Sequence, residues 1–367
     1  MTDMSAGRHR YRVLDAYRFL AASGVVFYHF ENHFQPFLAA PTHVLERFQF
    51  FVDFFFVLSG FVLMHTYGGR IGTVAAYRDF LRKRLARIYP LHLATIALFC
   101  AIGAATVVLH VTVRDRSFFD PSLLPANLLL IQAWGMTDHA GLNIPSWSIS
   151  AEWFVYLLFP LLALLVRRSG APLALLIAIA FVVAIETVRA AAGLPPGDAA
   201  TIDFGNLRAL PSFLAGMATY VLVDAMPARR IHWPVAHGFA IGVVALMLVS
   251  AWPYLIVALF PVLVGLIALA ERGGEPSVLA SRAGVTLGNA SFAVYMIHTF
   301  FQVAAVIAAR ATGWTSVPQL IAIAAVTYGV IVLASVASYR WFENPLRRRL
   351  SRGSSSGRIE PQVSRAA

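Results

Sequence analysis

The chain has 367 residues, of which 59% are hydrophobic and only 13% charged, and its formal net charge is +11. A soluble domain carries about a quarter charged residues, and the mean hydropathy of +0.70 describes the whole chain, so the apolar excess is not one anchor. These values exclude a disordered protein, a disulfide-rich secreted scaffold and an ordinary cytosolic enzyme. They predict an all-α membrane protein with several spans, in which the basic residues mark cytoplasmic loops and do not indicate nucleic-acid binding.

Ten apolar runs are about long enough to cross a bilayer as helices. The predicted spans are 13–31, 48–67, 88–109, 150–167, 171–189, 207–224, 235–251, 253–271, 287–309 and 317–339. The apolar segment 121–134 is too short to span and contains two prolines, so we expect a re-entrant or interfacial helix there. With the N-terminus placed in the cytoplasm, most of the 29 basic residues fall in cytoplasmic segments, which favours ten spans with both termini inside.

The organisation predicted from these spans is one membrane domain with two short ends. Residues 1–12 form a cytoplasmic segment, 13–349 the transmembrane domain, and 350–367 a Ser- and Gly-rich disordered tail in the cytoplasm. The first apolar run is interrupted by Arg18 and lacks a cleavage site, so we expect a retained span and not a signal peptide.

The first span carries Arg18 and His29, eleven residues apart on one face of a helix and separated by roughly 16 Å along its axis. Charged groups inside a bilayer are costly and often functional. Asp15 lies one turn before Arg18 and could pair with it. The alternative is structural: Arg18 reaches the inner interface and His29 marks the outer end.

The second span carries Asp53, and the fourth begins near Glu152. Ser150 is a candidate N-cap that would place Glu152 in the first helical turn, where the helix dipole favours a carboxylate. Both acids share the outer side with His29 in the predicted topology. A carboxylate beside an imidazole fixes its tautomer and raises its basicity, as general-base catalysis requires.

The third span opens with Arg84-Leu-Ala-Arg87-Ile-Tyr89-Pro90. Arg84 and Arg87 are neighbours on one helix face and could grip a phosphate with bidentate hydrogen bonds. A plain positive-inside cluster is the alternative.

Three further polar groups lie at membrane level in the second half of the chain. Glu186 is expected to pair with Arg189, and Glu343 to mark the inner end of a helix. His298 falls near mid-membrane, where it could be either a buried hydrogen-bonded residue or a catalytic one. The chain has no phosphate-binding loop, no Gly-x-Ser-x-Gly elbow, no His-Glu-x-x-His motif and no Cys/His set, so no metal site is expected.

Seven motifs, taken together and in order, resemble the acyltransferase family 3 membrane O-acyltransferases over residues 10–349. They are Arg18-x10-His29, Phe54-Phe-Phe-Val-Leu-Ser-Gly60-Phe, Arg84-x-x-Arg87-Ile-Tyr-Pro90, Trp147-Ser-Ile-Ser-Ala-Glu152, Arg208-x-x-Pro-Ser-Phe-Leu-x-Gly216, Leu287-Gly-Asn-Ala-Ser-Phe-Ala-Val-Tyr-x-x-His298 and Glu343-Asn-Pro345. Two positions depart from the family pattern, Ile149 and Phe292, where Leu and Tyr are common.

The resemblance implies transfer of an acyl group, in most members acetyl, from cytoplasmic acyl-CoA to a hydroxyl of a glycan or similar acceptor at the outer side of a bacterial inner membrane. Membrane lipid, acyl-CoA and the acceptor are the expected partners, and no oligomeric state is predicted. Many relatives carry a C-terminal esterase-like domain, which is not expected here. The implied CoA-binding residues are Arg18, Arg84, Arg87 and Tyr89. The implied catalytic residues are His29, as general base or acyl carrier, with Glu152 and Asp53. Further site candidates are His298, Ser148, Trp147, Arg208 and Glu343.

A transporter, or an acyl-exporting partner of a separate transferase, is the competing interpretation. Intramembrane charges also mark transport paths. The second half of the chain does not repeat the first and contains no paired broken helices, which favours the enzyme.

Overall fold

The computed structural model describes residues 10–38, 40, 42–110, 117–227, 231–249 and 252–351. Within these ranges the chain is helical and contains no β-strand. The predicted tail from residue 352 onward and the first nine residues lie outside the described part, so those two predictions are not addressed by the structure.

Long helices cover the predicted spans in the predicted order. They are α1 (Arg12–Phe34), α2 (Phe51–Tyr67), α3 (Val74–Val108), α5 (Trp147–Ala191), α6 (Gly205–Ala225), α7 (Trp233–Val249), α8 (Pro253–Arg272), α9 (Arg282–Thr312) and α10 (Val317–Ser338). The short helices are α4 (Leu124–Leu128) and α11 (Asn344–Ser351), the latter joined to α10 by a π-helical turn, η8 (Tyr339–Glu343).

Six helical stretches in the described residues are long and apolar enough to cross a membrane. This supports a multi-pass membrane protein. The count of ten spans and the cytoplasmic side of both ends stay predictions. The fourth and fifth predicted spans both fall on α5, which bends at Gly170, where φ is +76° and the backbone leaves the helical region. Glycine tolerates this conformation because it has no Cβ.

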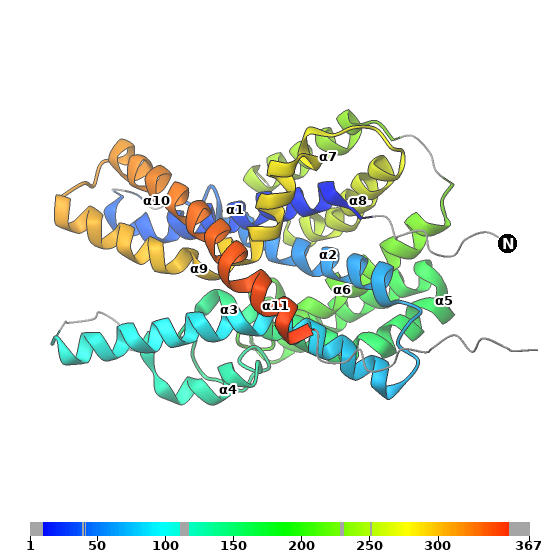
Figure 1. Ribbon diagram of the computed structural model, residues 1–367, viewed down its shortest axis with the longest axis horizontal. Helices are drawn as coiled ribbons and strands as arrows, with labels where there is room; N and C mark the ends of the chain where they lie inside the picture. Colours follow the sequence, from blue (N-terminus) through cyan, green and yellow to red (C-terminus); the bar gives the residue numbers. More distant parts are fainter. Residues whose placement is uncertain are drawn as a thin grey trace, which may run out of the picture.

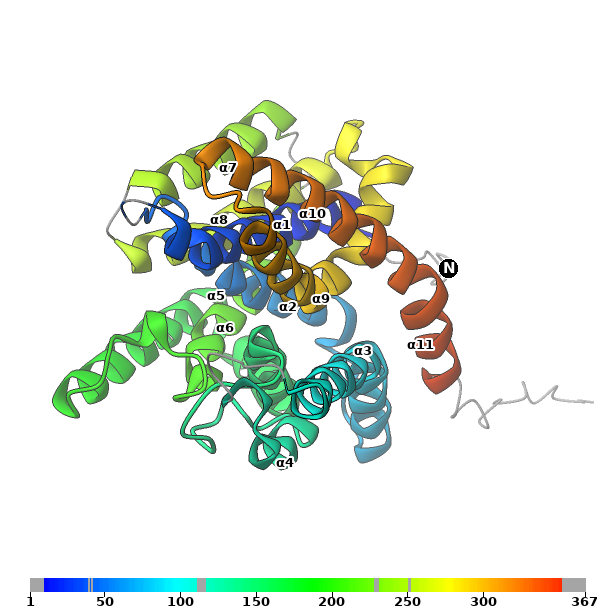
Figure 2. The same ribbon diagram turned by 90° about the vertical axis from the view of Figure 1, so that its left-hand side faces the viewer.

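The helices pack in groups around α2, as Figures 1 and 2 show. Most of them run along the long axis of the molecule in Figure 1. Viewed along that axis in Figure 2, α3 and α4 lie on one side of α1, α2 and α9, and α7 and α8 lie on the other. One buried cluster joins α2, α3, α5, α6 and α9; a second joins α1, α2, α7 and α8; a third joins α1, α9 and α10.

Helices α2 and α6 approach each other backbone to backbone. A Cβ atom on Gly60 would lie 2.0 Å from the carbonyl oxygen of Phe213, and one on Gly216 would lie 1.9 Å from that of Val57. Both positions therefore require glycine. This contact sets α2, which carries Asp53 and Ser59, against α6.

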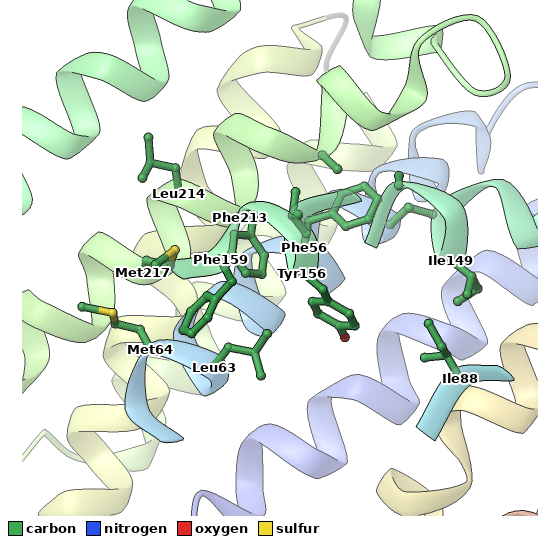
Figure 3. Close-up of a cluster of buried hydrophobic side chains, with 14 of the residues drawn as sticks. Phe56, Leu63, Met64, Ile88, Ile149, Tyr156, Phe159, Phe213, Leu214 and Met217 are labelled. Atoms are coloured by element: carbon green, nitrogen blue, oxygen red, sulfur yellow. The ribbon is translucent and has the colours of Figure 1, made fainter. Parts of the chain in front are cut away.

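The largest apolar cluster surrounds the start of α5 and is drawn in Figure 3. Phe159 and Phe213 are fully buried there, with ring centroids 6.3 Å apart in an edge-to-face arrangement. In Figure 3 the hydroxyl of Tyr156 points away from these two rings. The cluster thus packs behind Tyr156, whose hydroxyl faces the cavity described below.

The prediction that Ser150 caps a helix and places Glu152 in its first turn was wrong. Helix α5 begins at Trp147 with Ser146 before it, so Ser150 is inside the helix and not its cap, and Glu152 lies in the second turn. The Ser150 hydroxyl instead donates to the carbonyl of Leu130 at 2.8 Å.

The helix predicted over 121–134 is also much shorter, because a 3-10 turn, η4 (Pro121–Leu123), precedes α4, and Leu130 has a left-handed φ of +58° that ends helical geometry.

Candidate active site

A cavity of about 280 Å³ opens between α1, α2, α3, α5, α9 and α11. Two carboxylates, those of Asp15 and Glu152, line it together with five cationic side chains. The cations are Arg18, Lys83, Arg84, Arg87 and Arg347. The excess of positive charge in a partly enclosed, largely apolar space favours binding of an anion.

Arg84 is the cavity arginine with unused donor capacity. Its guanidinium carbon lies 5.5 Å from the ring centre of Tyr67, a cation–π contact. Its Nε is buried and has no hydrogen-bond partner among the described residues. A buried unpaired N–H is costly, so this donor fits a ligand with phosphate oxygens. Arg84 was predicted from its spacing to Arg87, and both line the same cavity.

Arg87 is held in place by an acid that lies 256 residues away in the chain. Its Nη1 donates to Oε2 of Glu343 at 3.2 Å, and its guanidinium lies 5.0 Å from the ring centre of Phe292. Glu343 is 4% exposed and Arg87 15%. The predicted view of Glu343 as a simple helix end is incomplete, because the π-helical turn directs its carboxylate to α3.

Arg18 makes the predicted pair with Asp15, with Nη1 and Oδ1 3.8 Å apart. Lys83 and Arg347 also line the cavity, and neither was singled out from the sequence. Arg347 follows Glu343 by four residues, so the helical spacing contained a signal for it.

Glu152 lies in the cavity wall with two hydroxyl donors. Its Oε1 accepts from Ser59 at 2.8 Å and from the Tyr156 hydroxyl. The predicted pairing of Glu152 with His29 is not among these hydrogen bonds, which join the carboxylate to α2 and to its own helix. Ser59 and Tyr156 were missed, although Ser59 stands in the Leu-Ser-Gly motif and Tyr156 follows Glu152 by one turn.

Ser148 and Tyr295 border the same cavity. Their hydroxyls lie 2.8 Å apart, and the Tyr295 hydroxyl donates to the carbonyl of Pro145 at 2.9 Å. This wall joins α9 to the start of α5.

His29 and His298 face each other beyond the wall, with ring centres 4.9 Å apart. Nδ1 of His29 lies 2.9 Å from the carbonyl oxygen of Val25, and Nδ1 of His298 lies 2.7 Å from that of Tyr295. Because a carbonyl only accepts, each Nδ1 carries the hydrogen and each neutral ring keeps its lone pair on Nε2. Backbone carbonyls thus fix the tautomer of both rings, whereas a carboxylate was predicted to fix that of His29.

Asp53 is engaged by Arg208 on α6. The Nη2–Oδ2 distance is 2.6 Å, the Nε–Oδ1 distance is 3.3 Å, and both side chains are nearly inaccessible. The guanidinium lies 5.3 Å from the Trp147 ring centre and 5.8 Å from that of Phe50. The predicted catalytic role of Asp53 has no support in these contacts, which describe a buried pair joining α2 and α6. Arg208 and Trp147 belong to this structural cluster.

Tyr89 does not line the cavity. Its hydroxyl donates to the carbonyl of Leu128 at the end of α4, at 2.8 Å, so its predicted place in the CoA site stays a prediction without support from the cavity lining. Arg189 pairs with Asp203 at 2.5 Å and not with Glu186, which accepts from the Gly197 amide at 2.9 Å. Helix α5 ends at Ala191, and the following loop supplies both partners.

On both α1 and α9 a residue that lines the cavity comes before the histidine in the chain. On α1 the cavity residue Arg18 precedes His29, and on α9 the cavity residue Tyr295 precedes His298. Eleven residues of helix place His29 roughly 16 Å beyond Arg18. The site is therefore elongated, with cations at one end and paired imidazoles further along.

A family model described as an acyltransferase domain, Acyl_transf_3, matches residues 11–336. Over 132 residues the chain is 40% identical to a protein of Streptomyces mycarofaciens named acyltransferase MdmB, a match that covers 35% of this chain and 32% of that protein.

Over 157 residues the chain is 33% identical to protein 2 in the picA locus of Rhizobium radiobacter, covering 39% of this chain and 77% of that protein. No solved structure matches the chain.

Proposed function

The chain belongs to acyltransferase family 3, and from this premise we propose that it transfers an acetyl group from acyl-CoA to a hydroxyl of a glycan or related acceptor in a bacterial inner membrane. The family match over residues 11–336 establishes the acyltransferase class. What we propose beyond this class is the identity of the donor, acyl-CoA, the identity of the acceptor, a glycan or related compound, and transfer at the outer side of the membrane.

The observation that carries the choice of acyl-CoA is the cationic cavity with an unpaired donor at Arg84. Phosphate groups accept bidentate hydrogen bonds from guanidinium groups, and arginine suits this role better than lysine. Arg84 and Arg87 lie about three turns into α3 (Val74–Val108), and Arg18 lies in the second turn of α1. We assign the CoA phosphates to these three side chains.

His29 is the proposed general base. Its Nε2 takes the proton of the acceptor hydroxyl while that oxygen bonds to the thioester carbonyl carbon. The carbon–sulfur bond then breaks, the acyl group stays on the acceptor oxygen, and the proton passes from His29 to the CoA sulfur. The hydrogen bond from Nδ1 to the Val25 carbonyl supports this role because it keeps the lone pair on Nε2.

Glu152 is given a different role from the one its sequence position suggested. Held by Ser59 and Tyr156 beside the cationic side chains, its carboxylate sets the arrangement of the cavity wall. We propose that it positions the cavity arginines and does not touch the imidazole of His29.

The test uses purified protein in detergent with labelled acetyl-CoA and membranes from a strain lacking the gene as the source of acceptor. An enzyme transfers label without a sealed compartment, whereas a transporter does not. Transfer by the wild type that is abolished in His29→Ala, with acetyl-CoA still bound, is the expected result. Equal transfer by both proteins would contradict the assignment of His29.

A further inference from the structure

Six deeply buried side chains beyond the cavity share an unusual pattern: one polar atom is bonded to a backbone carbonyl and the other has no partner among the described residues. None of the six is more than 5% exposed. They are His92, Asn127, Gln132, Asn143, His298 and Gln302, and we call them the acceptor row.

The four amides of the acceptor row are oriented without ambiguity. The side-chain nitrogens of Asn143 and Gln302 donate to the carbonyls of Met296 and Val26, at 2.9 and 2.8 Å. Those of Asn127 and Gln132 donate to backbone carbonyls in the same way. Because a carbonyl cannot donate, the nitrogen must face it, and the unpartnered atom is the amide oxygen, a pure acceptor.

The two histidines follow the same logic. Nε2 of His92 lies 2.9 Å from the carbonyl oxygen of Asn127, which leaves Nδ1 unpartnered, while Nδ1 of His298 faces Tyr295 and leaves Nε2 unpartnered. In the neutral ring each unpartnered nitrogen is an acceptor. The row therefore presents acceptors and no free donor.

The members of the row are linked by contacts from α3 to His29. His92 touches Asn127 on α4, which lies beside α3 in both views (Figures 1 and 2). Asn127, Gln132 and Asn143 line one small hollow of about 10 Å³, room for about one water molecule or one hydroxyl group. Asn143 then contacts α9 at Met296, near His298.

Gln302 completes the link, one turn after His298 on α9. It is bonded to the backbone of α1 at Val26, three residues before His29. The row thus extends from α3 to the proposed catalytic base, and its members are linked through hydrogen bonds to backbone carbonyls.

A buried acceptor without a partner destabilises the folded state, and native proteins contain few of them. Six in one region of the molecule, three of them around the same hollow, therefore favour bound molecules that donate hydrogen bonds. We propose that the acceptor row binds the substrate that receives the acyl group, and that this substrate is polyhydroxylated and uncharged where it meets the row. The inference rests on the proposed function, because it assigns the second substrate of the same reaction.

The chemistry of the row selects this ligand class. A simple lipid alcohol has one hydroxyl and could satisfy one acceptor only. A phosphate or carboxylate would bring further acceptors against those already there. A molecule with several neighbouring hydroxyls can donate to more than one member of the row: His298 and Gln302 lie one turn apart on α9, and the centre of the His298 ring lies 4.9 Å from that of His29, so one hydroxyl can be held while the next reaches the base.

The test compares Asn143→Leu and Gln302→Leu with the wild type and with Ser335→Ala. Ser335 is a buried control on α10 whose hydroxyl is satisfied by the Ile331 carbonyl at 2.7 Å. Three quantities are measured in detergent: the acetyl-CoA Kd, label transfer to acceptor in membranes from the deletion strain, and the Tm without acceptor.

We expect both row variants to keep the wild-type acetyl-CoA Kd and to lose transfer by about tenfold or more, the effect of one substrate hydrogen bond of about 1.4 kcal/mol. Their Tm should fall, because each variant also loses the side-chain N–H bond to a backbone carbonyl, so the level of transfer and not the Tm decides the test. Ser335→Ala should resemble the wild type in all three. A fall in Tm with unchanged transfer would show that the row holds structural water and would overturn the inference. Absence of both acetyl-CoA binding and transfer in the wild type would instead contradict the proposed function.

The ligand class is tested by competition. Maltose and 1-octanol, at equal hydroxyl concentration, are added to the wild-type transfer reaction. Stronger inhibition by maltose, reduced in Gln302→Leu, is expected. Inhibition by maltose no greater than that by 1-octanol would contradict a polyhydroxylated substrate.

Discussion

The two ends of the site differ in which of their buried atoms lack a partner. In the part of the chain that the structure describes, the unpartnered atom in the cavity is an arginine donor, Nε of Arg84, whereas the unpartnered atoms in the acceptor row are amide oxygens and imidazole nitrogens. One end therefore calls for an anion and the other for hydroxyl groups. A transferase that moves an acyl group between two chemically different substrates needs two different binding regions. The proposed base, His29, lies between the cavity and the acceptor row.

Loss of His29 should have the largest effect on the reaction. His29→Ala removes the proposed base and should lower transfer about 10²- to 10⁴-fold, the contribution of a positioned general base. The acetyl-CoA Kd should not change, because the side chain is outside the cationic cavity.

The matched control is His237→Ala. His237 stacks on Trp233 and is hydrogen-bonded to the Tyr17 hydroxyl on another part of the molecule. If His237→Ala lowers transfer as strongly as His29→Ala, the effect belongs to folding and not to catalysis.

Asp53→Asn should mainly reduce stability. It therefore distinguishes a residue with a structural role from the residues that bind the two substrates. It leaves the buried guanidinium of Arg208 without its counter-ion, a change that costs about 3–5 kcal/mol of folding free energy. A large fall in the Tm in detergent is expected, while the folded fraction keeps its acetyl-CoA Kd. Normal stability with abolished transfer would restore the catalytic role predicted from the sequence.

Arg84→Ala should weaken the binding of acetyl-CoA and leave the binding of the acceptor unchanged. Hydrogen bonds to charged groups contribute about 1.5–3 kcal/mol, so the acetyl-CoA Kd measured by calorimetry should rise roughly 10- to 100-fold. Arg84→Lys should recover only part of this, because lysine lacks the planar fork.

Arg168→Ala, an exposed arginine near the bend of α5, is the control for net charge. An equal loss of affinity in Arg168→Ala would mean that overall charge, and not the cavity, binds CoA.

Tyr89→Phe should have the smallest effect. The change removes one hydrogen bond to the Leu128 carbonyl, a contribution of about 0.5–1.5 kcal/mol to stability. Calorimetry should give an unchanged acetyl-CoA Kd. A clear rise in the Kd would return Tyr89 to the CoA site, where its position in the arginine motif had placed it.

The sequence was sufficient for features that depend on one helix at a time. Apolar runs located the long helices because membrane length and hydropathy are local properties. The spacing of Arg84 and Arg87, and of Asp15 and Arg18, predicted neighbours because i,i+3 positions share a helix face. The family motifs added the acyltransferase class.

Features that depend on which helices meet were not predictable in this way. Arg87 with Glu343, and Asp53 with Arg208, join helices far apart in the chain. Periodicity shows the face that a residue occupies and not the helix opposite it. Glu152 was therefore assigned to His29 on depth in the membrane alone.

The acceptor row was invisible to sequence reasoning for a further reason. Asn127 and Gln132 lie in the apolar segment 121–134, and Asn143 lies in the connection that follows it. Uncharged amides in such segments carry no periodic or charge signal that would single them out. Their importance follows from burial and from the atom that is left unpaired, and both are properties of the folded molecule.

The most direct test of a two-ended site is a pair of titrations on the same three proteins: the wild type, Arg84→Ala and Gln302→Leu. The acetyl-CoA Kd and the KM for the acceptor in deletion-strain membranes are measured for each. Arg84→Ala should raise the first and leave the second unchanged, and Gln302→Leu should do the reverse. If both variants shift both constants equally, donor and acceptor do not occupy separate ends and the account is wrong.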